Sequence, residues 1–456
     1  MVKCCSVLCI ALLLLSAVAA RHGFGPGRQD WGYSEVRPGA FMFWWLHYAG
    51  GGDQGYTDKP LLLWLQGGPG GSSTGFGNFE EIGPLDRSLN HRPHAWVNDY
   101  NVLFVDSPVG SGFSYVEDRS QLATNSTTVV QDLMRLLKDF YAQSVTYADW
   151  ERHVPLYIAS QSYGGRIAVE LADALVQAVR SGDMHCQLHA LFLGNAWLSP
   201  IDSISAWPDY LHWLGYVGAE GAARIEQRVA AVREQQQQQQ LEPAEQEQQS
   251  AKAIDSWHSL QQAIIRETHG INCYNVLKPT GRQSLPATTD DGSDELLEYG
   301  ETVWWWNVEE SASTTRQRLE QLMRGPVAHA LGIADKPQPW GAQRNAVFEA
   351  LATDFLRPTA TAVLGRLLNE TQLELVLYNG HLDLITCLPG TLRWIRRLLG
   401  EPLLREPFPR DSQGDIQGYR SVYGNSRFTL YTVLRAGHMV PVDNPTAMAY
   451  ILRVHT

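Results

Sequence analysis

The chain has 456 residues, of which 44% are hydrophobic and 18% are charged, and its formal net charge is −12 at pH 7. This length suffices for one large α/β domain with an insertion, or for two domains, with a sizeable buried core. Nothing in this acidic composition indicates nucleic-acid binding, which requires a positively charged face.

The first element is a secretory signal peptide, predicted at residues 1–20, "MVKCCSVLCIALLLLSAVAA". Lys3 supplies the charged start, Val7 to Leu15 the apolar core, and small residues at 17–20 the cleavage site. The alternative is a membrane anchor, but the apolar run is too short to span a bilayer comfortably. We therefore expect a mature protein with no membrane anchor, which enters the secretory pathway and is secreted or lysosomal.

Three of the six cysteines lie in the signal peptide, and Cys186, Cys273 and Cys387 remain. Three thiols form at most one disulfide, so the fold is not a disulfide scaffold. Asn125-Ser126-Thr127 and Asn369-Glu370-Thr371 are sequons, which makes Asn125 and Asn369 candidate glycosylation sites.

Short apolar runs predict buried strands, and amphipathic helical patterns fall between some of them, for example after Val130 and after Ile167. The alternation indicates an α/β fold with a mostly parallel central sheet that is covered on both faces. The predicted strands are Leu61–Leu65, Val102–Val105, Leu156–Ala159, Leu191–Leu193, Leu373–Tyr378 and Phe428–Leu434.

The α/β pattern breaks between residues 196 and 342 and resumes near Phe348. We therefore expect one discontinuous domain, residues 21–195 and 343–456, with a helical cap inserted at 196–342. Within the cap, the glutamine-rich segment 234–250 has no apolar periodicity and is predicted to be a disordered surface insertion.

The stretch "YIASQSYGGRIAVE", residues 157–170, runs a strand into Ser162 and then directly into a helical pattern. A serine on such a strand-to-helix turn is the nucleophile elbow, in which a tight turn lifts the hydroxyl above the sheet. Ser160 stands where the usual motif has glycine, so the local match is weak by itself. The alternative is a small residue that packs a helix against the sheet.

An elbow serine needs a base and an acid, in the chain order Ser, Asp, His. Asp383 in "NGHLDLI" and His438 in "AGHMVPVDNP" both follow predicted strands, and strand ends of a parallel sheet share one edge. Asp106 in "FVDSPVG" precedes the serine and is assigned a structural role at the floor of the site. His381 and Asp443 are competitors that we interpret as hydrogen-bonded loop residues.

The third element is "LLLWLQGGPGGSS", residues 61–73, in which a strand enters consecutive glycines. Such a loop exposes backbone N–H groups, as an oxyanion hole requires. The alternative is a nucleotide-binding loop. No Lys-Ser or Lys-Thr follows, and the spacing is not that of a dinucleotide fingerprint.

Together these segments resemble the serine carboxypeptidase family of α/β-hydrolases over nearly the whole mature chain. Five motifs occur in the family's order: "GGPGGSSTGFGNFEEIGPLD", "VLFVDSPVGSGFSY", "SQSYGG", "NGHLDLI" and "AGHMVPVDNP". The resemblance implies that Ser162 is the nucleophile, His438 the general base and acid, and Asp383 the residue that orients the histidine. It also implies that the backbone N–H groups of Gly68 and Tyr163 form the oxyanion hole.

The family binds the free C-terminal carboxylate of its substrate through a glycine-loop Asn and N–H and two Glu side chains. The loop positions here are Gln66 and Gly67, and one Glu is either Glu80 or Glu81, depending on how the motif is counted. The other Glu precedes the nucleophile, and here it is Gln161. Because glutamine does not ionise, we expect this protein to lose less substrate affinity between pH 5 and 7 than its Gln161→Glu variant.

The resemblance thus implies a serine-type carboxypeptidase that acts on peptide or protein C-termini without metal or cofactor. Two other hypotheses remain: the protein is an acyltransferase or esterase on the same scaffold, or it is a catalytically impaired secreted binding protein. Residue preference and oligomeric state are not determined by the sequence.

Overall fold

The computed structural model describes residues 23–52, 55–238, 246–278, 311–357, 360–410, 414–424 and 426–456. The predicted signal peptide, residues 1–20, lies outside the described residues. No helix in these described ranges is both long enough and apolar enough to cross a bilayer.

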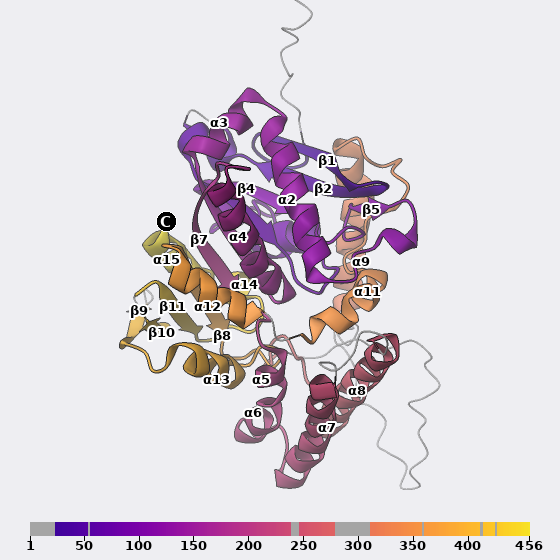
Figure 1. Ribbon diagram of the computed structural model, residues 1–456, viewed down its shortest axis with the longest axis vertical. Coiled ribbons are helices and arrows are strands. Elements are labelled where there is room, and N and C mark those ends of the chain that lie inside the picture. The colour runs from indigo at the N-terminus through magenta and orange to yellow at the C-terminus, as the bar shows by residue number, and fades with distance from the viewer. Residues whose placement is uncertain are drawn as a thin grey trace, which may run out of the picture.

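In the described part of the chain the strands form one mixed sheet of 11 strands (Figure 1). Its order is β1-β2-β4-β3-β6-β7-β8-β11-β10-β9, and β5 pairs with β2. The six central strands, β4 to β11 in this order, are parallel, and antiparallel strands flank them on both sides. The bounds are β1 Gln29–Arg37, β2 Ala40–His47, β3 Leu61–Leu65, β4 Asn101–Val105, β5 Tyr115–Val116, β6 Pro155–Gln161, β7 Gln187–Gly194, β8 Glu374–Gly380, β9 Leu404–Arg410, β10 Ile416–Tyr423 and β11 Phe428–Val433.

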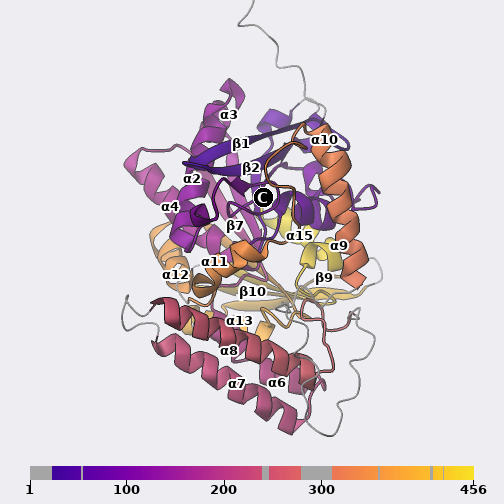
Figure 2. The same ribbon diagram turned by 90° about the vertical axis from the view of Figure 1, so that its right-hand side faces the viewer.

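Helices cover both faces of this sheet (Figures 1 and 2). The predicted fold class, a mostly parallel α/β sheet, is confirmed. The bounds are α2 Ser126–Ala142, α3 Val145–His153, α4 Tyr163–Ser181, α5 Pro200–Ile204, α6 Trp207–Trp213, α7 Ala219–Gln238, α8 Gln246–Glu267, α9 Ser311–Leu322, α10 Ala328–Ala330, α11 Asn345–Phe355, α12 Ala360–Glu370, α13 Leu388–Leu399, α14 Val440–Asp443 and α15 Pro445–His455.

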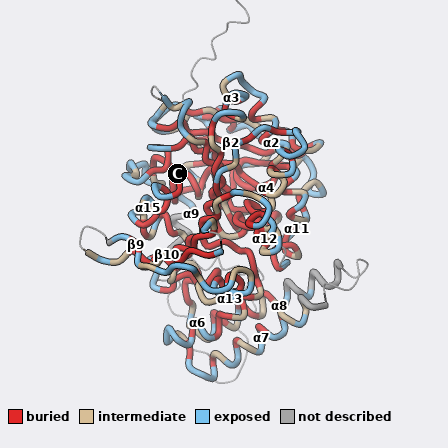
Figure 3. The backbone as a smooth tube through the Cα atoms, turned by 60° about the vertical axis from the view of Figure 1, so that its left-hand side comes forward, coloured by how far each residue is buried: buried red, intermediate tan, exposed pale blue. Residues whose placement is uncertain are grey.

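The central strands are apolar throughout because both of their faces are buried, as the red interior of Figure 3 shows. In β3, Leu61, Leu63 and Leu65 join the core cluster under α2, α4, α12 and α13, whereas Leu62 and Trp64 join the cluster under α15. Side chains alternate between the two faces of a strand, so one apolar run supplies both cores.

The chain between β7 and β8, which are neighbours in the sheet, forms the helices α5 to α12. Helices α7 and α8 lie side by side at one end of the molecule (Figures 1 and 2) and are joined by an ion pair of 2.6 Å between Arg224 and Glu267.

Helices α9 and α10 lie elsewhere, against the β1–β2 hairpin. There Leu319 of α9 and Ala328 of α10 join a third core cluster, and the Trp31 Nε1–H donates to the Leu331 carbonyl at 2.8 Å.

The glutamine-rich segment is not irregular in its described parts. Helix α7 continues to Gln238 and α8 begins at Gln246, so the prediction of disorder is wrong for the residues on either side of 239–245, which lie outside the described residues. Glutamine and glutamate are good helix formers, so a segment rich in them can be helical without any apolar periodicity.

Candidate active site

The register of the sheet brings the predicted site residues to one edge. Leu65 pairs with Ser160, Gln161 with Gly194, and Gly194 with Tyr378. Val433 likewise pairs with Gly380. The strands β3, β6, β7, β8 and β11 therefore end almost level, and the segments that carry Gln66, Ser162, Asp383 and His438 all leave the sheet at its carboxyl edge.

Ser162 occupies the tight turn between β6 and α4. Its backbone has φ 56° and ψ −126°, a strained conformation for a residue with a side chain. Its N–H donates to the Gly194 carbonyl at 3.0 Å, and its carbonyl accepts from Gly165 at 2.9 Å and Trp197 at 2.8 Å. A Cβ on Gly164 would lie 2.4 Å from the Leu65 carbonyl oxygen. The turn thus has the geometry of a nucleophile elbow.

Asp383 and His438 form a buried hydrogen-bonded pair, in which Nδ1 of the imidazole lies 2.8 Å from Oδ2 of the carboxylate. An ionised carboxylate only accepts hydrogen bonds, so Nδ1 carries the proton and Nε2 is left as an acceptor. Oδ1 of Asp383 also accepts from the Ile385 N–H at 2.9 Å, and Oδ2 accepts from the Thr386 side chain. The pair has the arrangement of the acid and base of a catalytic triad.

Gln161 links the elbow to this pair. Its Nε2 donates to the backbone carbonyl of His438 at 2.9 Å, and its Oε1 accepts from Nε2 of Gln66 at 2.7 Å. The residue next to Ser162 is therefore bonded directly to the residue that carries the imidazole. The three predicted triad segments lie together in space.

Glu81 completes a polar cluster with the two glutamines, which we call the Gln66–Glu81–Gln161 cluster. Nε2 of Gln66 donates to Oε1 of Glu81 at 3.0 Å. Glu81 is 1% exposed, and burial raises its pKa to about 8. Its Oε2 is buried without a hydrogen-bond partner among the described residues, so this carboxyl group has an unused polar atom at the cluster.

Glu80 lies outside this cluster, although the sequence could not separate it from Glu81. Its Oε2 forms an ion pair with Arg87. Burial raises the pKa of Glu80, and the positive charge of Arg87 lowers it by a smaller amount. Both glutamates belong to the π-helical segment η3, Ser73–Ile82. Of the two candidates, the geometry favours Glu81 as the carboxyl of the site.

The glycine loop packs against the nucleophile. A Cβ on Gly67 would lie 2.6 Å from Cβ of Ser162, so only glycine fits at this approach. Gly68 has φ 118°, which also requires glycine, and the Gly71 N–H donates to the Gly67 carbonyl at 3.0 Å. Tyr163 is the first residue of α4, where a helix leaves its N–H groups without intrahelical partners. The glycine loop thus lies against Ser162 on one side, and the N-terminus of α4 begins on the other.

Asp106 and His381 have structural partners. The Asp106 carboxylate is buried and accepts from Ser72 at 2.8 Å, from Thr74 through both its N–H and its hydroxyl, and from the Phe113 N–H at 2.8 Å. Nδ1 of His381 lies 3.3 Å from the Val433 carbonyl. These contacts match the structural roles expected for them.

Asp443 binds a segment that sequence reasoning missed, residues 272–278, which we call the strap. Its Oδ2 accepts from Nδ2 of Asn275 at 2.9 Å and from the Gly437 N–H at 2.8 Å. The strap also bonds to both catalytic loops: the Leu384 N–H donates to the Cys273 carbonyl at 3.1 Å, and the His438 N–H donates to the Tyr274 carbonyl at 2.6 Å. Nothing in the strap's composition predicts these backbone contacts.

Asn195 is a second residue that was missed. It directly follows β7, and its Nδ2 donates to Oδ2 of Asp383 at 2.6 Å. The same signal that identified Asp383, a polar residue just past a predicted strand, was present at this position.

The remaining predictions concern modification and metals. Cys186, Cys273 and Cys387 are all buried. The Asn125 side chain caps α2 by accepting from the Thr128 N–H at 2.9 Å, whereas Asn369 is exposed near the end of α12. Among the described residues, no group of three or more His, Cys, Asp or Glu side chains could hold a metal ion.

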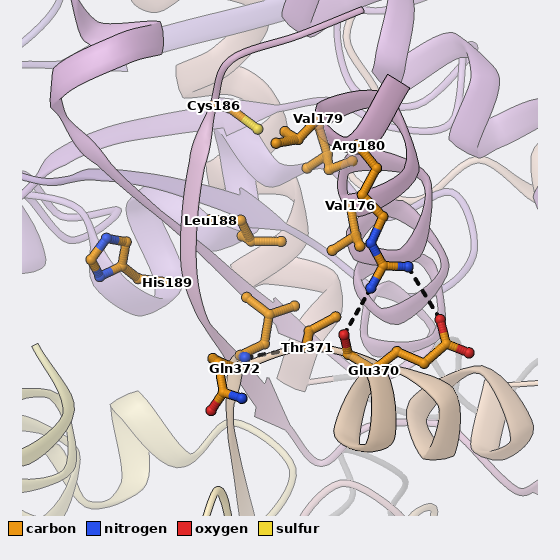
Figure 4. Close-up of a pocket in the computed structure, with 11 residues that line it drawn as sticks. Val176, Val179, Arg180, Cys186, Leu188, His189, Glu370, Thr371 and Gln372 are labelled. Carbon is orange, nitrogen blue, oxygen red and sulfur yellow. Dashed lines mark hydrogen bonds and ion pairs between the residues drawn. The ribbon is translucent and has the colours of Figure 1, made fainter. Parts of the chain in front are cut away.

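A separate cavity of about 500 Å³ lies at the opposite edge of the sheet, where β7 begins and α12 ends (Figure 4). Its lining is largely aliphatic, and its arginine, Arg180, is paired with the side chain and carbonyl of Glu370. The Cys186 thiol in its wall has a pKa raised to about 11 by burial. These groups carry no arrangement for acyl-transfer chemistry.

A mixed, mostly parallel sheet with a serine elbow and a buried Asp–His pair at its carboxyl edge defines an α/β-hydrolase. A solved structure agrees in fold: Kex1(delta)p, a prohormone-processing carboxypeptidase from Saccharomyces cerevisiae, superposes with a TM-score of 0.74. Its sequence is 20% identical, and the match covers 94% of this chain and 91% of that one.

The chain belongs to the serine carboxypeptidase family, whose sequence model matches residues 22–455. It is 34% identical to the retinoid-inducible serine carboxypeptidase of Homo sapiens, over 94% of this chain and 92% of that protein. It is 33% identical to serine carboxypeptidase-like 51 of Arabidopsis thaliana, over 92% of this chain and 90% of that protein.

Proposed function

We propose that the protein is a serine-type carboxypeptidase that removes C-terminal residues from peptides through an acyl-enzyme at Ser162. The observation that carries the proposal is the buried 2.8 Å pair of Asp383 and His438, joined through the 2.9 Å bond from Gln161 to the turn that holds Ser162. Family membership supplies the class of reaction, and this geometry supplies the groups that would perform it.

In the proposed reaction Oγ of Ser162 attacks the carbonyl carbon of the last peptide bond, and Nε2 of His438 takes the hydroxyl proton. The carbonyl oxygen becomes an oxyanion, which the N–H groups of Gly68 and Tyr163 stabilise. When the C–N bond breaks, His438 gives its proton to the departing amine. A water then attacks the ester carbonyl with His438 again as the base, releasing the shortened peptide.

The Gln66–Glu81–Gln161 cluster and the Gly67 N–H would bind the free carboxylate of the substrate. Glu81, with a pKa of about 8, keeps its proton at neutral pH, so its unpartnered Oε2 can donate a hydrogen bond to that carboxylate. Neutral donors avoid the repulsion that an ionised carboxyl would impose at this position.

The domain division belongs to the same proposal. Residues 21–195 and 343–456 would form the hydrolase domain, and residues 196–342 the inserted cap. The connection between the adjacent strands β7 and β8, which forms α5 to α12, supports an insertion at this point. Residues 1–20 would direct the protein into the secretory pathway, to be secreted or lysosomal.

The test is labelling of the purified mature protein with a fluorophosphonate, combined with release of the last residue from blocked dipeptides across pH 4–8. Wild type should be labelled and should release free amino acid, Ser162→Ala should do neither, and Ser181→Ala, at the exposed end of α4, should do both. Labelling without release, but with transfer to an added alcohol, would instead identify an acyltransferase. Absence of labelling would leave a binding protein.

A further inference from the structure

Asn195 lies between the ends of β7 and β8 and is fully buried, with a relative exposure of 0%. Its φ is 41°, in the left-handed region, which asparagine tolerates better than most residues other than glycine. Its backbone N–H donates to the Tyr378 carbonyl at 2.9 Å, continuing the pairing of the two strands by one residue. The backbone therefore holds the side chain at one fixed place on the catalytic edge.

Both ends of the Asn195 carboxamide are used. Oδ1 accepts from the Gly380 N–H at 3.2 Å, and Nδ2 donates to Oδ2 of Asp383 at 2.6 Å. A backbone N–H requires an acceptor and a carboxylate requires a donor, so the two partners define which end of the amide is which. No rotation of the amide would preserve both bonds.

Within the part of the chain that the structure describes, the other donors to the Asp383 carboxylate, apart from His438, are Ile385 and Thr386. Both belong to the loop of Asp383 itself and would move with it. Asn195 is the donor that comes from another strand. It thereby fixes the carboxylate relative to the sheet and not only relative to its own loop.

The same short segment also holds the nucleophile. The carbonyl of Gly194, the preceding residue, accepts from the Ser162 N–H at 3.0 Å, and the N–H of Trp197 donates to the Ser162 carbonyl at 2.8 Å. Residues 194–197 therefore contact the elbow through the backbone and the acid through the Asn195 side chain.

We propose that Asn195 is a positioning residue that sets the Asp383–His438 pair in line with Ser162. It contacts no reacting atom and acts through Asp383. Its loss would leave the carboxylate held by its own loop and by His438, but no longer fixed to β7. The imidazole would then be less well aligned with Ser162, so serine activation would fall while substrate binding would not. Residues that orient metal ligands from outside the coordination sphere typically contribute about 10–100-fold, and we expect a comparable effect on a catalytic carboxylate. The inference rests on the proposed triad.

The informative substitution is Asn195→Gly, because glycine adopts the positive φ without strain and removes only the side chain. We expect kcat, per labelled active site, to fall about 10–100-fold with KM within about twofold, and the rate of fluorophosphonate labelling to fall by the same factor as kcat. The matched control is Asn101→Gly. Asn101 is equally buried, bonds to Tyr56, Lys59 and Ala49, and lies at the start of β4, far from the catalytic edge. The Asn101→Gly variant should be less stable than wild type but should have the same kcat.

Asn195→Asp is the second variant, nearly identical in shape, in which an acceptor replaces the donor opposite Asp383. It should be impaired at least as strongly as Asn195→Gly. A kcat and a labelling rate within twofold of wild type in either variant would overturn the proposal, as would a rise in KM with kcat unchanged.

Labelling depends on serine activation and not on carboxylate recognition. If wild type is labelled but releases no amino acid, the carboxypeptidase proposal fails, whereas a slower labelling of Asn195→Gly still supports the role of Asn195.

Discussion

Gln161 and His438 are joined by a hydrogen bond of 2.9 Å from the glutamine side-chain amide to the histidine backbone carbonyl. This contact places a donor that cannot ionise between the proposed nucleophile and base. A carboxylate at the same position would face a carbonyl oxygen and would have to be protonated to keep the bond.

The first prediction is that Gln161→Glu makes substrate binding depend on acid pH. In wild type, Glu81 stays protonated from pH 5 to 7 because its pKa is about 8, so KM should change little over this range. The variant adds a carboxyl group that loses its proton as the pH rises, next to Glu81 and the substrate carboxylate. Its KM should therefore rise by about tenfold or more. Measuring kcat and KM for both proteins at pH 5, 6 and 7 tests this, and superimposable profiles would contradict it.

A second prediction concerns stability. The pKa of Glu81 is higher in the folded protein, about 8, than its ordinary value of 4.5, so the folded state binds this proton more tightly. Its contribution is fully present below pH 4.5 and is lost as the pH rises through 8. In Glu81→Gln this loss should be absent. The stability of the variant relative to wild type should rise between pH 5 and 8 by on the order of 4 kcal/mol.

Urea unfolding at pH 5, 6, 7 and 8 measures that difference. Glu349→Gln is the control, since Glu349 is an exposed partner of Arg119. Its difference from wild type should not vary with pH. A Glu81→Gln curve parallel to that of wild type would show that the carboxyl is not held protonated.

The third prediction concerns the buried arginine behind the elbow. Arg166 is 1% exposed and donates to the carbonyls of Asp354 and Arg357, at 2.5 and 2.8 Å, and to Glu170 at 3.1 Å. Removing one partner of a buried charged network costs about 3–5 kcal/mol. We expect Arg166→Ala to lose that much stability in denaturant unfolding, whereas Arg119→Ala, in an exposed pair, should lose less than about 1 kcal/mol. Equal losses in the two variants would refute this ranking.

The fourth prediction tests the strap, residues 272–278. Asp443→Ala removes the acceptor of both Asn275 and Gly437, and so loosens the strap and the His438 loop together. We expect kcat to fall about tenfold with little change in KM. Asp415→Ala, which removes an exposed partner of Arg435, should leave kcat unchanged. A lower melting temperature with an unchanged kcat would mean that the strap stabilises the fold without aligning the histidine.

The buried parallel strands could be predicted because they are continuous apolar runs, and β3 has the predicted bounds, Leu61–Leu65. Strand β9 was not predicted, because "LREPFPR" carries charges and two prolines and lies at the edge of the sheet, where pairing is satisfied on one side only. The formation of β9 therefore depends on its pairing in the folded sheet and not on its own composition.

The candidate site also contains residues that the sequence could identify and residues that it could not. Ser162, Asp383 and His438 could be found because each follows a strand, and parallel strands end at one edge. The choice between Glu80 and Glu81 could not be made by counting. Both glutamates lie in the π-helical η3, and it is Glu81 whose side chain contacts Gln66. The strap could not be found because its bonds to the catalytic loops are made by backbone atoms.

The packing of α9 and α10 on the β1–β2 hairpin has a consequence for synthesis. Trp31 finds its partner Leu331 300 residues later in the chain. A ribosome delivers the hairpin long before the helices that cover it, so the nascent protein carries an uncovered aromatic face through most of its translation. This aromatic face can be buried in its native way only after α9 and α10 have been synthesised. We therefore expect a chain arrested before residue 311 to expose a hydrophobic surface that chaperones bind.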